Sequence, residues 1–164
     1  ILNRGIEAEI LPVAQRYGMG ALVWSPLAKG MLTGRIRQGQ QTDLRRAGMA
    51  PFAPQFDDTR RLDVVERLVP IAEEAGMKLT HLAMAFAIAH PGVTAALIGP
   101  RTMEHLDDLL AGMDISLSDE ILDQIDEIVP PGTDVGARDG AAYVPQPLST
   151  PSLRRRPLDE RAAA

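Results

Sequence analysis

The sequence contains no cysteine, which excludes a disulfide framework and a metal site built on thiolates. Aromatic residues are scarce, with one Trp, two Tyr and three Phe among 164 residues, and no expected helix carries a dense basic face. These two features argue against a nucleic-acid-binding surface, which combines basic stripes with stacking aromatics. No apolar run approaches the roughly 20 residues of a membrane-spanning helix. The three histidines are too scattered to predict a metal site.

The start of the chain shows neither a signal peptide nor an initiator methionine, since it opens with Ile1-Leu2-Asn3-Arg4. We therefore expect a cytoplasmic protein that is a fragment or a processed product of a longer one. A length of 164 residues suffices for one domain with a hydrophobic core.

The charge is unevenly distributed along the chain, although the net charge is only −5. Residues 1–61 hold 9 Lys and Arg against 5 Asp and Glu, whereas residues 62–130 hold 3 against 13. A basic first third suits an anionic small ligand held near its loops. The simpler interpretation, which we favour, is that the acidic residues coat the solvent faces of helices.

Apolar periodicity predicts a succession of helices and two buried strands. The expected helices cover residues 6–17, 62–75, 80–90, 103–111 and 118–129, and the expected strands cover 19–24 and 93–98. We predict helix starts capped by Thr80, Thr102 and Ser118, and helix ends at Gly18, Gly76 and Gly112. Pro70 should kink or split its helix. A long loop is expected over 35–61, and an extended, proline-rich tail over 131–164, ordered only where Tyr143 or Leu148 docks.

This order of elements implies βα units with parallel strands. Two parallel strands cannot form a sheet with both faces covered, so we expect an incomplete piece of a larger α/β fold. In such folds ligands bind at the carboxyl ends of the strands.

Two segments follow the expected strands at positions suited to a ligand. The turn over Ser25–Gly34 contains Gly30 and Gly34, which let its backbone approach a ligand. Arg101 lies directly before the helix that Thr102 is expected to cap, where the helix dipole also favours a phosphate. A guanidinium suits a phosphate through paired hydrogen bonds.

Three blocks of the sequence resemble the aldo-keto reductases, in order and at sensible spacing. They are Leu2-Asn3-Arg4 with the Glu7 to Pro12 segment, Trp24-Ser25-Pro26-Leu27-Ala28 with Gly30 and Gly34, and Ile98-Gly99-Pro100-Arg101-Thr102 with Glu104 and Leu106. The Trp24-Ser25-Pro26-Leu27-Ala28 motif is most similar to the bacterial and potassium-channel-β-like branches of that family. The resemblance covers residues 1–130 and implies the C-terminal portion of a (β/α)8 barrel, about strands seven and eight with flanking helices.

The resemblance implies NADPH or NADP as the cofactor and an aldehyde or ketone as the substrate of the complete enzyme. Arg101 would contact the 2′-phosphate, Arg35 and Arg46 would reach the pyrophosphate side, and His105 and Asp108 would border the adenosine. The full set of implied cofactor residues is Trp24, Ser25, Pro26, Leu27, Ala28, Gly30, Arg35, Arg46, Gly99, Arg101, His105 and Asp108. Trp24 is equally well interpreted as an indole that anchors the core.

The resemblance also implies what this chain lacks, because the family's catalytic Tyr, Lys, Asp and His belong to the first half of the barrel. We therefore predict no catalytic residue and no metal ligand here, and no activity of the chain alone. The alternative is a non-catalytic module that binds a nucleotide or a protein partner. In either case we expect self-association or pairing with the missing N-terminal half, because edges and apolar faces are left open.

Overall fold

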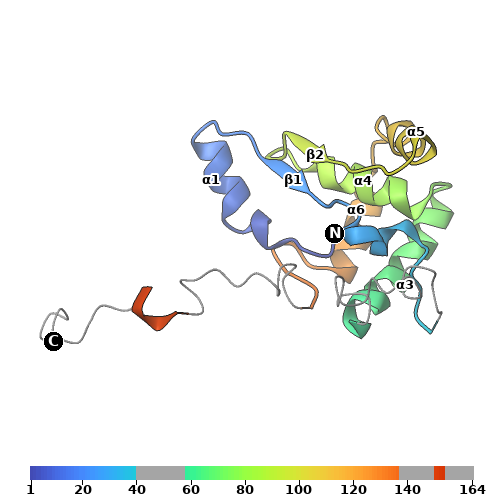
Figure 1. Ribbon diagram of the computed structural model, residues 1–164, viewed down its shortest axis with the longest axis horizontal. Coiled ribbons are helices and arrows are strands. Elements are labelled where there is room, and N and C mark those ends of the chain that lie inside the picture. Colours follow the sequence, from blue (N-terminus) through green and yellow to red (C-terminus); the bar gives the residue numbers. More distant parts are fainter. Residues whose placement is uncertain (40–57, 137–149, 154–164) are drawn as a thin grey trace, which may run out of the picture.

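The computed structural model describes residues 1–39, 58–136 and 150–153 and has an α/β arrangement (Figure 1). Strands β1 (Leu22–Trp24) and β2 (Ala95–Leu97) pair in parallel, with Val23 opposite Ala96. The helices are α1 (Ile10–Arg16), α3 (Thr59–Glu74), α4 (Leu79–Ala89), α5 (Met103–Ala111) and α6 (Asp119–Ile128), with 3-10 turns η1 (Gly5–Glu7), η2 (Ala28–Thr33) and η5 (Pro151–Leu153). The predicted order of helices and strands is confirmed.

The hydrophobic core lies where α3, α4, α6 and η2 meet. Leu68, Leu82, Ile125 and Met31 contribute fully buried side chains from these four elements. Each helix turns one apolar face inward, so the spacing that predicts the helices also predicts most of this core. In Figure 1, α1 lies on the other side of β1, away from α3 and α6.

Two of the three predicted helix caps are confirmed. The Thr102 hydroxyl accepts a hydrogen bond from the His105 N–H at 3.2 Å, and the Ser118 hydroxyl accepts one from the Ile121 N–H at 3.4 Å. The prediction for Thr80 is wrong, because α4 begins two residues earlier, with Lys78 as its N-cap residue. Thr80 is instead a buried residue inside the helix.

Both strands are shorter and more exposed than the predicted buried strands. Leu22 and Trp24 on β1 are 62% and 65% exposed, and Leu97 on β2 is 52% exposed. These three side chains share one face of the two-stranded sheet, because residues two apart on a strand point the same way. The described residues do not cover that face, which is why apolar sequence here does not mean burial.

Of the two predicted effects of Pro70, a kink or a split, the split does not occur. Helix α3 runs from Thr59 to Glu74 with Pro70 inside it, on the exposed side. Burial of Leu68 and Ile71 on the opposite side stabilises the helix across the hydrogen bond that proline cannot make. The helix also starts inside the predicted 35–61 loop, with the Asp58 carboxylate accepting a hydrogen bond from the Arg60 N–H at 3.1 Å.

The first predicted helix is also shorter than expected. The 3-10 turn η1 precedes α1, and Tyr17 follows the last residue of α1 with 70% of its surface exposed. Both Gly18 and Gly76 have positive φ directly after a helix, as predicted for the residue that ends it.

The chain stays packed for a few residues beyond position 130. The Val135 N–H donates to the Leu2 carbonyl at 2.8 Å, and the Arg4 N–H donates to the Thr133 carbonyl at 2.9 Å. Residues 131–136 are therefore tied to the N-terminal segment rather than extended away from it. Tyr143 and Leu148, the predicted docking residues of the tail, lie outside the described residues.

Candidate functional site

A cavity of about 670 Å³ opens at the carboxyl ends of both strands, between the loop after β1 and the loop that leads from β2 into α5. Nine of the predicted cofactor residues line it: Ser25, Pro26, Leu27, Gly30, Arg35, Gly99, Arg101, His105 and Asp108. They come from two segments about 70 residues apart in the sequence. Parallel pairing of the strands brings these two segments together, as expected for an α/β ligand site.

The loop after β1 has an unusual backbone. Ser25, Ala28 and Lys29 have φ values of 55°, 48° and 55°, in the left-handed region that favours glycine. Such positions cost on the order of 1–3 kcal/mol each and cluster at functional sites. Two short hydrogen bonds hold the turn, from the Ala28 N–H to the Ser25 carbonyl at 2.8 Å and from the Lys29 N–H to the Ser25 hydroxyl at 3.2 Å.

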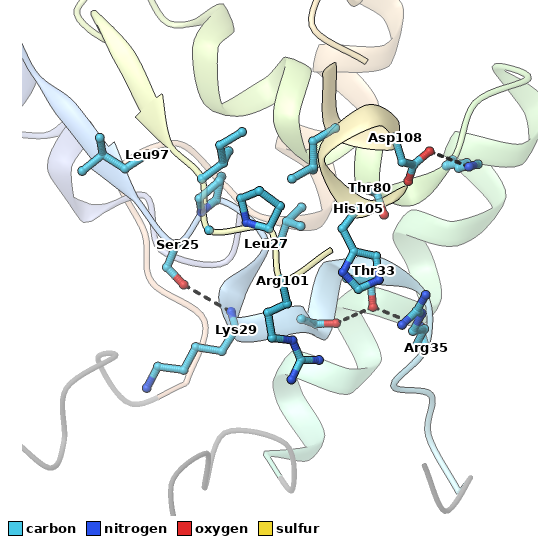
Figure 2. A pocket seen from close by; sticks show the side chains of 17 residues that line it. Ser25, Leu27, Lys29, Thr33, Arg35, Thr80, Leu97, Arg101, His105 and Asp108 are labelled. Atoms are coloured by element: carbon cyan, nitrogen blue, oxygen red, sulfur yellow. Dashed lines mark hydrogen bonds and ion pairs between the residues drawn. The ribbon is translucent and has the colours of Figure 1, made fainter. Parts of the chain in front are cut away.

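The opposite wall of the cavity carries the N-terminus of α5. Arg101 is exposed directly before the Thr102 cap, and His105 lies one turn into the helix (Figure 2). The N–H groups and dipole at this end favour an anion. In Figure 2 the Arg101 side chain lies between Lys29 and Arg35, and the Lys29 side chain extends away from the other two.

Cations outnumber anions on the cavity wall. Among the residues that the structure describes, Lys29, Arg35 and Arg101 make no ion pair. The fourth cation, Lys78, donates to the Asp108 carboxylate at 2.5 Å. The cavity therefore presents three cationic side chains that can bind anionic groups of a ligand.

The Asp108 carboxylate is itself bound within the protein. Besides Lys78, the His81 ring Nε2 lies 3.2 Å from the Asp108 carboxylate and 2.9 Å from the Asp108 carbonyl. The Lys78 hydrogen bond lowers the pKa of Asp108 below its ordinary value. Asp108 thus joins α5 to the start of α4, and its carboxylate faces Lys78 as well as the cavity.

Three predicted cofactor residues do not line this cavity. Trp24 and Ala28 instead line a second, larger hollow of about 1170 Å³ between the sheet, α1 and the N-terminal segment. Trp24 does not anchor the core, because its indole is mostly exposed. Arg46 lies outside the described residues.

Several residues of the cavity wall were not predicted, of which Lys29, Thr33, Lys78 and Thr80 are polar. Lys29 lies within the glycine-rich turn, so the sequence carried a signal for it. Lys78 and Thr80 reach the cavity only because α4 packs beside α5, a tertiary contact that local sequence patterns do not reveal. Leu97, Ile98, Pro100 and Leu109 add apolar wall.

No group of three or more His, Asp or Glu side chains that could hold a metal ion occurs over residues 1–39, 58–136 and 150–153. The same ranges include no helix long and apolar enough to cross a membrane. The one described tyrosine, Tyr17, follows α1 and does not line the cavity.

Comparisons with known proteins agree with the resemblance in the sequence. The model of the aldo/keto reductase family matches residues 1–130. The chain is 38% identical over 130 residues to an uncharacterised oxidoreductase of Bacillus subtilis, YrpG, covering 79% of this chain and 38% of that protein. It is 32% identical over 131 residues to a rice protein provisionally named voltage-gated potassium channel subunit beta, covering 76% of this chain and 39% of that protein.

A third relative is a fission yeast protein provisionally named aryl-alcohol dehydrogenase. The chain is 29% identical to it over 127 residues, which cover 77% of this chain and 35% of that protein. The chain therefore spans little more than a third of the length of the curated relatives that it matches. Because the family model covers most of the chain, the conclusion is plain: this chain belongs to the aldo/keto reductase family.

Proposed function

We propose that this chain forms the cofactor-binding part of an NADPH-dependent aldo/keto reductase, with the phosphate groups of the cofactor in the cavity between the loop after β1 and α5. The single observation that carries this proposal is the meeting of nine predicted residues and three unpaired cations around one cavity. The family match and the oxidoreductase relatives support an oxidoreductase.

The residues on the cavity wall fit a dinucleotide. The cavity volume of about 670 Å³ lies in the range of small-molecule sites, which is about 300–1,000 Å³. Arg101 beside the α5 N-terminus suits the 2′-phosphate, and Arg35 suits the pyrophosphate side. His105 and Asp108 would border the adenosine, with Asp108 held in place by Lys78. When bound, the nicotinamide supplies the hydride for reduction of a carbonyl.

We place the chain near the end of a barrel on the basis of the sequence resemblance. Members of this family fold as (β/α)8 barrels, and the two parallel strands form an open sheet consistent with part of one. We assign β1 and β2 to about the seventh and eighth strands. We take residues 1–130, the span of the family match, as the barrel part and residues 131–164 as an appended tail.

The chemistry of the complete enzyme would require groups beyond this chain. A reductase needs a tuned proton donor beside the nicotinamide, and Tyr17, which follows α1, does not line the cavity. We therefore propose that the chain alone does not reduce carbonyls, and that it does so when joined to the rest of a barrel. The substrate would be an aldehyde or ketone.

A second candidate function is a nucleotide-binding or interaction module without chemistry. The observation that favours it is the similarity to proteins provisionally named potassium channel subunits, which points to subunit association. The two candidates differ in one assay, which is NADPH oxidation with a carbonyl such as 4-nitrobenzaldehyde after addition of an N-terminal half-barrel. Restored turnover supports the reductase, whereas binding of NADPH without turnover supports the module.

The cofactor assignment is tested by Arg101→Ala. Loss of a charge-assisted contact of ~1.5–3 kcal/mol should weaken NADPH binding about 10- to 150-fold, while NADH binding barely changes. Fluorescence titration of both cofactors measures this difference. Arg16→Ala is the matched control, because Arg16 is an exposed arginine on α1 that does not line the cavity. Equal losses for both cofactors in Arg101→Ala would contradict the 2′-phosphate assignment.

A further inference from the structure

Two side chains at the start of α4, Lys78 and His81, both contact Asp108 on α5. His81 itself does not line the cavity. We propose that His81 is a positioning residue, which holds α5 and thereby fixes Arg101 and His105 on the cavity wall. This inference rests on the proposed function of the same cavity. It gives ligand affinity a dependence on a side chain that does not touch the ligand.

The first support is the set of hydrogen bonds at Asp108. His81 Nε2 lies 2.9 Å from the Asp108 carbonyl oxygen and 3.2 Å from the carboxylate oxygen that Lys78 also contacts. A carbonyl and an ionised carboxylate only accept hydrogen bonds, so His81 Nε2 carries a proton and donates it to them. In a regular α-helix the Gly112 N–H would reach the Asp108 carbonyl, but it bonds to the Leu109 carbonyl at 3.2 Å instead. His81 therefore supplies a donor to a carbonyl in the last turn of α5.

The second support is the glycine that ends α5. Gly112 has φ −90° and ψ −3°, a conformation that other residues adopt readily, so the backbone here does not require glycine. A Cβ atom at Gly112 would lie 2.8 Å from His81 Cδ2 and 3.0 Å from His81 Cγ. A methyl group at this position would therefore clash with the imidazole in its present place. The missing side chain at position 112 is what lets His81 reach the end of α5.

The third support is the small apolar surface that otherwise holds α5. Of the residues in α5, all of them described, only Leu109 is buried, and the helix packs chiefly against α4. Polar contacts to α4 therefore carry a larger share of the docking of α5 than of α3, which buries one whole face. Figure 2 shows His105 and Asp108 on the same helix. Because Arg101 directly precedes that helix, a shift of α5 would move both Arg101 and His105 relative to the loop after β1.

The test compares two replacements of His81 in the full chain, with 2′,5′-ADP binding measured by calorimetric titration. His81→Leu keeps much of the bulk and loses the donor, so it should bind about 3- to 10-fold more weakly, the scale of one lost hydrogen bond. His81→Gln keeps an N–H group that can reach the Asp108 carbonyl, so it should retain most of the affinity. His90→Leu, at the other end of α4 and away from the cavity wall, is the matched control and should bind as wild type does.

A second pair of variants tests the contact between His81 and the end of α5. Gly112→Ala should weaken binding about as much as His81→Leu, because its methyl group displaces the imidazole. In a His81→Ala protein the ring that this methyl would strike is gone, so the addition of Gly112→Ala should cause no further loss. Equal losses from Gly112→Ala in both backgrounds would contradict the role of the contact.

Hydrogen–deuterium exchange without ligand separates positioning from general stability. In His81→Leu, exchange should be faster in peptides covering residues 99–112 and unchanged in those covering α3. Affinity within about twofold of wild type in His81→Leu, equal losses in His81→Gln and His81→Leu, or faster exchange over the whole chain would overturn the positioning role and leave the proposed function standing. If the wild-type protein does not bind 2′,5′-ADP, the proposed function fails, whereas the exchange result still decides whether His81 fixes α5.

Discussion

The helical side of this molecule and its sheet differ in how completely the chain covers its own apolar residues. Where α3, α4, α6 and η2 meet, Leu68, Leu82 and Ile125 are 0% exposed. On the sheet, Leu22 and Trp24 keep more than half of their surface in contact with solvent. Residues of similar hydrophobicity therefore have opposite environments, and the difference lies in which neighbours the chain supplies.

The exposed side chains form what we call the open face, namely Ile10, Val13, Leu22, Trp24 and Leu97 on α1, β1 and β2. Four of them line the larger hollow, and Leu97 belongs to the cavity wall. Full burial of a large apolar side chain contributes about 1.5–3 kcal/mol. A partner that covered several side chains of the open face would therefore gain a contribution of this size from each of them. Contiguous exposed apolar residues of this kind mark a surface for association.

The sharpest contrast should come from shortening one leucine in each region. Leu82→Ala removes a fully buried side chain and should lower the free energy of unfolding by about 2–5 kcal/mol. Leu22→Ala, at a site that is 62% exposed, should change it by less than about 0.5 kcal/mol. Urea unfolding followed by circular dichroism measures both. Similar losses in the two variants would show that the open face is covered in solution.

Association through the open face is the next expected effect. The isolated chain should be oligomeric, aggregation-prone or partly molten, because the sheet has unpaired edges and an apolar face. Leu22→Lys places a charge on that face and should shift sedimentation toward the monomer, whereas Arg16→Gln on the far end of α1 should not. A monodisperse wild-type monomer with a sharp cooperative melt would contradict this expectation.

The smallest effect concerns an ion pair at the rim of the helical side. Arg37 donates to Glu66 at 2.8 Å and 2.5 Å, and the Gln38 N–H adds a third bond at 2.9 Å. The Arg37 hydrogen bonds, then that of Gln38, lower the pKa of Glu66 from 4.5 to about 2. The folded state therefore binds this proton less readily than the unfolded state, so the stabilisation is present above pH 4.5 and declines as pH falls toward 2.

Glu66→Gln should accordingly cost about 1 kcal/mol at pH 7, since both side chains are about a third exposed, and the cost should shrink between pH 4.5 and 2. Unfolding curves of both proteins across this range measure it. Glu127→Gln, at an exposed position of α6, is the matched control and should cost little at any pH. A Glu66→Gln cost that stays constant down to pH 2 would rule out the ion pair as its source.

Sequence patterns predicted the helical side well and the sheet poorly, for a physical reason. Amphipathic spacing and capping residues such as Thr102 and Ser118 act locally, so they fix α5 and α6 without knowledge of the rest of the fold. Burial of Leu22 and Trp24 depends on neighbours that the described residues do not supply. Pro70 does not split α3, because tertiary packing outweighs one lost hydrogen bond.

The candidate site divides in the same way. The residues that follow each strand were found from the sequence, because strand order alone brings Gly30 and Arg101 to one edge. Lys78 and Thr80 were missed, because they line the cavity only through the packing of the start of α4 beside α5. The use of the Asp108 carboxylate by Lys78 and His81 was missed for the same reason, since both partners lie about 30 residues away.

The most direct test of the central claim, that the cavity holds the phosphates of NADP(H), is hydrogen–deuterium exchange of this protein with and without 2′,5′-ADP. This probe carries the adenosine and its phosphates but no nicotinamide. We predict slower exchange in peptides covering residues 25–35 and 99–108, and unchanged exchange over α1. With NADPH the protection should extend to Trp24. Protection confined to α1 and the open face, or none at residues 99–108, would contradict the account.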